Sequence, residues 1–120
     1  MSAELSEEEG RGEEWAEWAT APDTLTLGKD EVHVWRASLN LRDARRRQLS
    51  YVLARDEVGR AARFHFRKDH DHFVAARVIL RSLLGLYLGT NPARIRFAYN
   101  SYGKPSLEAV SGEDALHFNV

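Results

Sequence analysis

The stretch DHDHFVAARVILRSLLGLYLG, residues 69–89, has the pattern of one long amphipathic helix around which the rest of the chain is expected to fold. Asp69 is the expected N-terminal cap, and Gly89 is the expected residue just past the C-terminus. Pro92 follows soon afterwards and prevents the helix from continuing. Apolar residues recur at spacings of three and four, which places on one face of the helix Phe73, Ala76, Leu80, Leu83, Leu84 and Tyr87.

The segments before this helix predict one strand and two short helices. Residues 31–39, EVHVWRASL, alternate in polarity and are rich in β-branched and aromatic side chains, which is typical of a strand. Asn40 then suits a helix N-cap. Residues 41–66 have roughly helical apolar spacing with a break expected near residues 54–56, and Asp56 is the expected cap of the second helix.

The segments after the long helix predict a turn between two further strands. Residues 94–99, RIRFAY, alternate as a strand, and residues 100–105, NSYGKP, predict a turn in which Gly103 is free to take a positive φ. Residues 115–120, ALHFNV, have the pattern of a last strand. The order β, α, α, α, β, β predicts a single α+β domain over residues 31–120, with a small antiparallel-type sheet packed on the long central helix and two shorter helices.

Residues 1–30 differ in composition from the rest and are predicted to be an acidic leader without fixed structure. Residues 1–31 hold ten acidic residues against two basic ones, a net charge of −8, whereas residues 32–120 hold eight acidic against fifteen basic ones, a net charge of +7. Trp15 and Trp18 would share one face of a short helical turn. Whether they dock on the domain or form a sticky tail is left open.

Several classes of protein are disfavoured by composition. The chain has no cysteine, so disulfides and thiolate metal sites are excluded, and an intracellular, cytoplasmic setting is favoured. No apolar run approaches the roughly 20 residues that a membrane span needs, so no membrane partner is expected. The acidic N-terminus also lacks the apolar core of a signal peptide.

The side chains that most often carry chemistry do not form a complete active site. His70 and His72 look like a metal run, but residues two apart on a helix point in different directions, so a structural or surface role is expected. The carboxylates of the basic part fall mostly at expected caps or in loops, and no pair suits a Mg²⁺ site or an acid/base pair. We therefore predict no catalytic residue and no metal ligand in this chain.

The basic side chains point instead to an anionic partner. They flank the expected helix junctions and the 100–105 turn, and if those regions meet they form a pocket with several charge-assisted donors, which suits a phosphate. A nucleic-acid backbone is less suited because aromatic side chains interleaved with the basic ones are scarce. A solvated basic face is the alternative interpretation. The side chains concerned are Arg60, Arg63, Arg67, Lys68, Arg77, Arg81, Arg94, Arg96 and Lys104.

The same region resembles the N-terminal half of the Sfp-type 4′-phosphopantetheinyl transferases. The similarity runs from residue 32 to residue 120 and rests on four motifs in order: the RF…D…F..AR..LR..LG.YLG helix, the P..IRF strand, the YGKP.L turn and the closing FN strand. Each motif alone is weak, but their order and spacing together are specific.

The resemblance implies an enzyme built as a pseudo-dimer of two similar α+β halves. Such enzymes use Mg²⁺ to move the phosphopantetheine arm of coenzyme A onto a serine of an acyl or peptidyl carrier protein, and coenzyme A lies in the cleft between the halves. The first half contacts the 3′-phosphate and adenine end, and Arg60 and Lys104 stand at positions matching such contacts. Arg77 is a further candidate, while Gly103 and Pro105 shape the turn that holds Lys104.

The sequence departs from the family pattern in two places. His70, Asp71 and His72 stand where relatives are often arginine-rich. Relatives continue from FN into Ser-His-Ser, and later into G-x-D-x-E and W-x-x-K-E motifs that hold the diphosphate, the Mg²⁺ and the general base; none is present here. The resemblance therefore implies half of an enzyme, inactive alone or dependent on a second chain for the C-terminal half. A non-catalytic binding or assembly module that self-associates or docks on another chain is the alternative.

Overall fold

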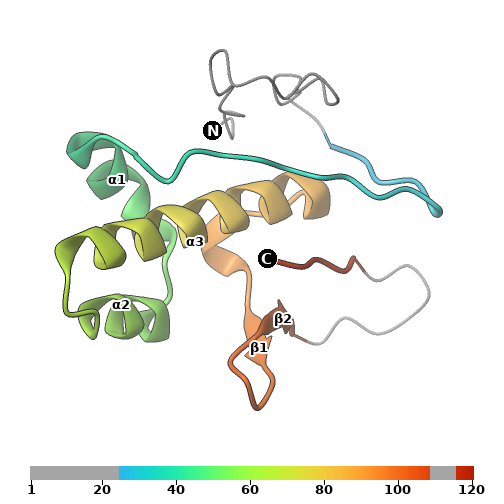
Figure 1. The fold of residues 1–120 in the computed structure, drawn as a ribbon. Helices are drawn as coiled ribbons and strands as arrows, with labels where there is room; N and C mark the ends of the chain where they lie inside the picture. The colour runs from blue at the N-terminus through green and yellow to red at the C-terminus, as the bar shows by residue number, and fades with distance from the viewer. Residues whose placement is uncertain (1–24, 109–115) are drawn as a thin grey trace, which may run out of the picture.

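A computed structural model of the chain describes residues 25–108 and 116–120, and these form three α helices and one two-stranded sheet (Figure 1). The predicted α+β class is confirmed. Two short 3₁₀ turns, η1 and η2, follow α1 and α3. The elements are α1 (Asp43–Leu49), η1 (Ser50–Val52), α2 (Arg55–Ala62), α3 (Arg67–Leu88), η2 (Pro92–Arg94), β1 (Phe97–Tyr99) and β2 (Pro105–Leu107).

Helix α3 is the long helix that the sequence predicts, and it begins three residues earlier than expected. Phe66 occupies the N-cap position with extended backbone and no capping side chain, and its carbonyl accepts the first helical hydrogen bond from the His70 N–H at 3.1 Å. The prediction that Asp69 caps the helix is therefore wrong; Asp69 lies within the first turn, where a negative charge favours the helix dipole. Gly89 ends the helix in the left-handed conformation, with φ of 63°, as predicted.

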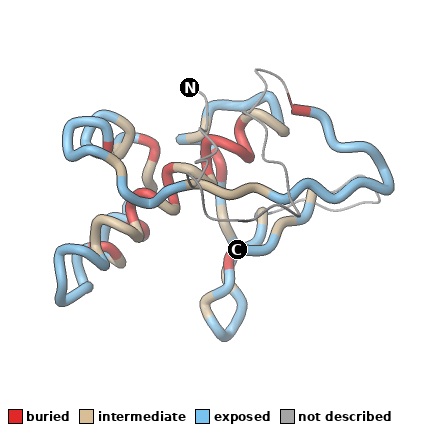
Figure 2. Tube along the Cα trace, turned by 45° about the horizontal axis from the view of Figure 1, so that its top comes forward, coloured by how far each residue is buried: buried red, intermediate tan, exposed pale blue. Residues whose placement is uncertain are grey.

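The buried face of α3 is broader than the predicted stripe. Ala76 and Leu80 are only half-buried, while Arg77 and Arg81, expected on the flank, are buried. The reason is that α3 packs against the α1 and α2 side and also against η2, so one apolar stripe cannot cover it. Figure 2 marks the buried positions along the chain. Its buried residues are Val74, Ala75, Arg77, Val78, Arg81, Ser82, Leu83, Leu84 and Gly85.

Two apolar clusters hold the other segments on α3. The first joins α2 and η1 to the first half of α3 through Val52, Ala61, Val74 and Val78. The second joins Leu25 to Leu83 nearer the end of α3. The predicted acidic leader spans residues 1–30, and residues 1–24, with Trp15 and Trp18, lie outside the described residues; within its last part, Leu25 is buried.

The two predicted short helices are present as α1 and α2, but their starts differ from the prediction. Arg42, not Asn40, precedes α1 as its N-cap, and the Asn40 side chain instead lies 3.0 Å from Nε2 of His72. Ala54, not Asp56, precedes α2. Its N–H donates to Glu57 Oε1 at 2.8 Å, so the carboxylate three residues into the helix replaces the expected cap.

Residues 31–39 do not form the predicted strand. They run extended alongside α3, and they belong to no sheet (Figure 1). Alternation marks extended backbone with one packed side, whereas a strand also needs a neighbouring backbone. Here the packed side is held by side chains: Trp35 Nε1 donates to the Tyr87 hydroxyl at 2.8 Å, and His33 Nδ1 lies 2.5 Å from the same oxygen.

The sheet is a single hairpin whose strands pair antiparallel, with Phe97 opposite Leu107 and Tyr99 opposite Pro105. Gly103 lies in the connecting turn with φ of 80°, as predicted. The predicted last strand is not formed: residues 116–120 belong to no sheet, although the Phe118 ring packs at 5.9 Å from that of Phe97. Among the described helices, none combines the length and apolar character that crossing a bilayer requires.

Candidate anion-binding site

Glu57 on α2 is the centre of a buried ionic cluster beneath α3. Its side chain has no exposed surface. Arg81 donates to Oε1 from Nε at 2.7 Å and pairs with it through Nη2 at 2.6 Å, while Arg77 Nη1 donates to Oε2 at 3.2 Å. Charged groups are buried at acceptable cost only when paired and hydrogen-bonded in this way, so α2 is fastened to α3 at one point.

This cluster contains more positive than negative charge. The side chains of Arg77 and Arg81 are 9% and 2% exposed, and both face the single carboxylate of Glu57. The three buried side chains together therefore carry one surplus positive charge. A surplus of this sign raises the potential of the surface next to the cluster and favours an anion there.

Arg81 also ties the cluster to the segment that leads into β1. Its Nη1 donates to the carbonyl oxygens of Pro92 at 2.9 Å and Ile95 at 2.7 Å. Pro92 is the first residue of η2 and Ile95 is its C-cap, so both carbonyls lie between α3 and β1. Arg81 thus fixes the position of β1 relative to α3.

Arg77 reaches the hairpin directly. Its Nη1 donates to the Tyr99 hydroxyl at 2.7 Å. Arg60, from the last turn of α2, places its guanidinium carbon 5.4 Å from the centre of the Tyr99 ring and 5.7 Å from that of Phe73. Arg77 lies over the same two rings, at 5.5 and 5.1 Å. The two guanidiniums and two rings bring α2, α3 and β1 together at one corner.

The turn between β1 and β2 lies against this corner. The Asn100 side-chain oxygen accepts hydrogen bonds from the backbone N–H groups of Tyr102 and Lys104, each at 2.9 Å, which closes the turn. A side-chain carbon built on Gly103 would lie 3.8 Å from Arg60 Nη2, so the guanidinium of Arg60 rests beside the turn.

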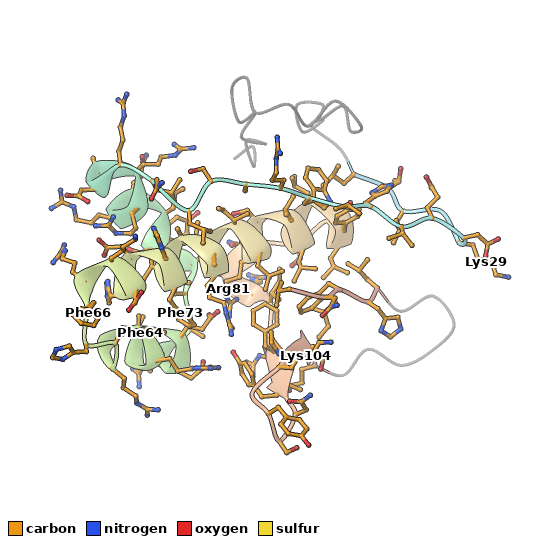
Figure 3. All side chains as sticks on the ribbon, in the orientation of Figure 1. Lys29, Phe64, Phe66, Phe73, Arg81 and Lys104 are labelled. Atoms are coloured by element: carbon orange, nitrogen blue, oxygen red, sulfur yellow. The ribbon has the colours of Figure 1, made fainter. Side chains whose placement is uncertain are left out.

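The structure brings together most of the residues proposed from the sequence as cofactor contacts. Arg60 and Arg77 lie against Tyr99, Gly103 lies beside Arg60, and Pro105 is buried opposite Tyr99 in the sheet. Lys104 precedes Pro105 and is exposed (Figure 3). Arg77 differs from Arg60 and Lys104 because its guanidinium is buried and already bound to Glu57 and Tyr99.

Sequence reasoning missed Glu57 and Tyr99. From the sequence, Glu57 is only one of the carboxylates of the basic part, and Tyr99 is only the last residue of the predicted 94–99 strand. One signal could have found them: Arg77 and Arg81 stand one turn apart in an otherwise apolar helix, and buried arginines require a carboxylate and further acceptors.

A groove of about 660 Å³ opens next to this corner, between the start of α2 and the β1 segment. Tyr99, Phe97 and Arg81 line it from within. Arg94 and Arg96 add positive charge to its wall, and Asp56 and Glu108 add negative charge. The groove is therefore mixed in charge, with aromatic surface on one side.

His70, Asp71 and His72 of the DHDH stretch are engaged with protein neighbours. His70 Nδ1 donates to Asp71 Oδ1 at 2.9 Å, and Arg46 Nε lies 3.4 Å from the same oxygen. The hydrogen bond from His70, and then the charges of Arg46 and Arg67, hold the pKa of the Asp71 carboxyl below its usual 3.8 against an opposing effect of burial. Within residues 25–108 and 116–120, no three His, Asp or Glu side chains gather as metal ligands.

Comparison of the sequence with known proteins identifies the family of the chain. Residues 35–120 match the family described as "4'-phosphopantetheinyl transferase, N-terminal". The chain is also 44% identical over 103 residues to 4'-phosphopantetheinyl transferase HetI of Nostoc sp., a match that covers 86% of this chain and 44% of that protein. The chain therefore spans less than half the length of this curated relative.

Proposed function

Because the chain belongs to the 4′-phosphopantetheinyl transferase family, we propose that it is the N-terminal domain of an enzyme that transfers phosphopantetheine from coenzyme A to a serine of an acyl or peptidyl carrier protein. The observation that carries this proposal is the corner where Arg60, Tyr99 and the 100–104 turn meet beside a buried cluster with surplus positive charge. Such a corner suits a phosphate group of coenzyme A.

In this proposal the candidate residues have different tasks. Arg60 and Lys104 contact the 3′-phosphate, because both are basic and border the same turn. Gly103 permits the positive φ of the turn, and Pro105 anchors its far end in the sheet. Arg77 contributes from behind the ring of Tyr99, because its guanidinium is held by Glu57.

Calorimetric titration of the 120-residue protein with coenzyme A tests this proposal. Binding is expected, and Arg60→Ala is expected to weaken it about tenfold or more, since a hydrogen bond to a charged group contributes roughly 1.5–3 kcal/mol. Arg63→Ala is the control, because Arg63 is an exposed arginine at the C-cap of α2, whereas Arg60 is half-buried against the Tyr99 ring. Failure of the wild-type protein to bind coenzyme A would refute the proposal.

We assign no chemical step of the transfer to this chain, because no three His, Asp or Glu side chains gather as metal ligands among its described residues. The sequence also contains no Ser-His-Ser, G-x-D-x-E or W-x-x-K-E motif. The purified protein alone is therefore expected to leave an apo carrier protein unmodified, as judged by mass spectrometry. A mass increase equal to phosphopantetheine would contradict the requirement for a second chain.

A second candidate function is that of an assembly module. Val32, Val34 and Val120 are 87%, 72% and 78% exposed, which leaves apolar side chains available to another polypeptide. Sedimentation velocity at several concentrations tests this. Association that is reduced by Val32→Ser with Val34→Ser would support it, and a monomer at every concentration would argue against self-association.

A further inference from the structure

The Tyr99 hydroxyl has a proton whose direction is set by its partner. Arg77 Nη1 lies 2.7 Å from the hydroxyl oxygen. A guanidinium has donors only, so the Tyr99 oxygen must be the acceptor in this contact. The hydroxyl proton must therefore point toward another group. Within the described part of the chain, the Tyr99 hydroxyl forms its hydrogen bond with Arg77. Its own proton therefore has no acceptor among the described residues.

The donor in this contact cannot easily turn away. The Arg77 side chain is 9% exposed, and the same Nη1 donates to Glu57 Oε2 at 3.2 Å. Glu57 is in turn held by Arg81 through its other oxygen, at 2.7 Å from Nε. Buried, fully paired networks of this kind have few alternative arrangements. The orientation of the Tyr99 hydroxyl is therefore determined by side chains two contacts away.

The hydroxyl is also placed where an anion would meet it. Tyr99 is half-buried and lines the 660 Å³ groove. Arg60 lies over its ring at 5.4 Å, and the Gly103 backbone borders Arg60. A free hydroxyl donor and a guanidinium are thus presented at the same corner, which is the combination that binds a phosphate monoester.

We infer that Tyr99 donates its hydroxyl proton to a phosphate monoester bound beside Arg60, and that Glu57 and Arg77 are positioning residues that aim this proton. This inference rests on the proposed function, because it names a further contact of the same ligand. No bond is made or broken; the relay of Glu57, Arg77 and Tyr99 fixes a donor before the ligand arrives, which avoids the cost of ordering it on binding.

Calorimetric titration with coenzyme A and with 3′-dephospho-coenzyme A tests the inference, since the two ligands differ in one phosphate monoester. For Tyr99→Phe, we expect the Kd for coenzyme A to rise about tenfold or more and the Kd for the dephospho ligand to stay the same. Tyr51→Phe is the matched control: Tyr51 lies in η1, away from the hairpin turn, is 69% exposed and should show wild-type affinity for both ligands.

Arg77→Lys tests the positioning part. Lysine keeps the positive charge but lacks the planar group that bridges Glu57 and Tyr99, so the same selective loss for coenzyme A is expected. A merely structural defect would weaken both ligands together. Equal loss for both ligands, or no loss for coenzyme A with Tyr99→Phe, overturns the inference while leaving the proposed function intact. Wild-type protein that binds neither ligand refutes the proposed function and the inference with it.

Discussion

At the scale of single residues, Glu57 has an unusual position, because it is a fully buried carboxylate shared by two buried guanidiniums. Removing either arginine leaves charge or backbone carbonyls without partners in a region that water does not reach. Nothing in the local sequence marks Glu57 as different from the neighbouring Asp56, which is exposed. Only the packing of α2 on α3 distinguishes the two carboxylates.

Arg81→Ala is expected to lower the free energy of unfolding by about 3–5 kcal/mol, because it breaks a buried ion pair and frees the carbonyls of Pro92 and Ile95. Urea denaturation followed by circular dichroism measures this. Arg94→Ala is the control, since Arg94 is exposed, and it should change stability by less than about 0.5 kcal/mol. A loss of under 1 kcal/mol for Arg81→Ala would mean that the cluster contributes little.

Asp71 gives the stability of the protein a pH dependence in the acid range. Its folded-state pKa is lowered, first by the hydrogen bond from His70, so the stability it contributes is fully present above the ordinary carboxyl pKa of 3.8. That contribution is lost as the pH falls through the lower, folded-state value. We expect Asp71→Asn to show a smaller decrease in unfolding midpoint below pH 4 than the wild type, in urea melts between pH 2 and pH 6. Parallel pH profiles for the two proteins would contradict this.

At the scale of elements, the helices could be predicted, but the residues that cap their N-termini could not. Periodicity and the pair Gly89 and Pro92 were sufficient for α3, because helix signals are local. The starts of α1 and α2 depend on how the preceding chain enters the helix, so Arg42 and Ala54 stand where Asn40 and Asp56 were expected. Residues 31–39 do not form the predicted strand, and the reason is non-local. They are held extended by side-chain contacts with α3 and not by a paired backbone.

Two glycines within helices should respond in opposite ways to substitution by alanine. A side-chain carbon on Gly85 would lie 2.9 Å from the backbone oxygen of Thr90, so Gly85→Ala must shift the 89–92 segment, at a cost of about 1–3 kcal/mol. Gly59 has nothing within 4 Å, so Gly59→Ala should stabilise α2 by about 0.5–1 kcal/mol. Thermal unfolding of both variants measures the difference, and stabilisation by Gly85→Ala would show that the end of α3 adapts freely.

Tyr87→Phe is expected to loosen the extended segment without unfolding α3. The variant removes the acceptor for Trp35 Nε1 and the partner of His33, and a lost hydrogen bond costs about 1 kcal/mol. Proteolytic cleavage within residues 32–37 should therefore quicken roughly fivefold, with unchanged cleavage within α3. Tyr51→Phe is a suitable control, because Tyr51 is 69% exposed. Unchanged cleavage within residues 32–37 would mean that apolar contacts alone hold the segment.

At the scale of the whole molecule, the corner formed by Arg60, Arg77 and Tyr99 and the folded core are parts of one network. Arg77 touches Tyr99 at the corner and Glu57 in the core, and Arg81 extends the same network to η2. The order of helices and of the hairpin strands could be predicted, and so could the convergence of Arg60 with the 100–104 turn, because family motifs mark those positions. The burial of Arg77 and the role of Tyr99 depend on tertiary contacts that no local pattern encodes.

Because Arg77 connects the Tyr99 corner to the buried Glu57, coenzyme A bound at the corner is expected to stabilise the entire fold. A ligand that binds only the native state at a hundred times its Kd adds about 2.7 kcal/mol, which for a chain of this size corresponds to a rise in Tm of roughly 10 °C. Differential scanning fluorimetry measures the shift, and Arg60→Ala should reduce it at the same ligand concentration. An unchanged Tm at a concentration that saturates the site would contradict the coupling.

The turn closed by Asn100 has a consequence for the chemical ageing of the protein. Slow deamidation of that side chain would leave an oxygen able to accept from Tyr102 and Lys104, so the loop would keep its shape. The new carboxylate would, however, place a negative charge beside the spot where phosphate is expected, and repel it. Old preparations would then look intact by spectroscopy while their capacity for nucleotide-like ligands declines.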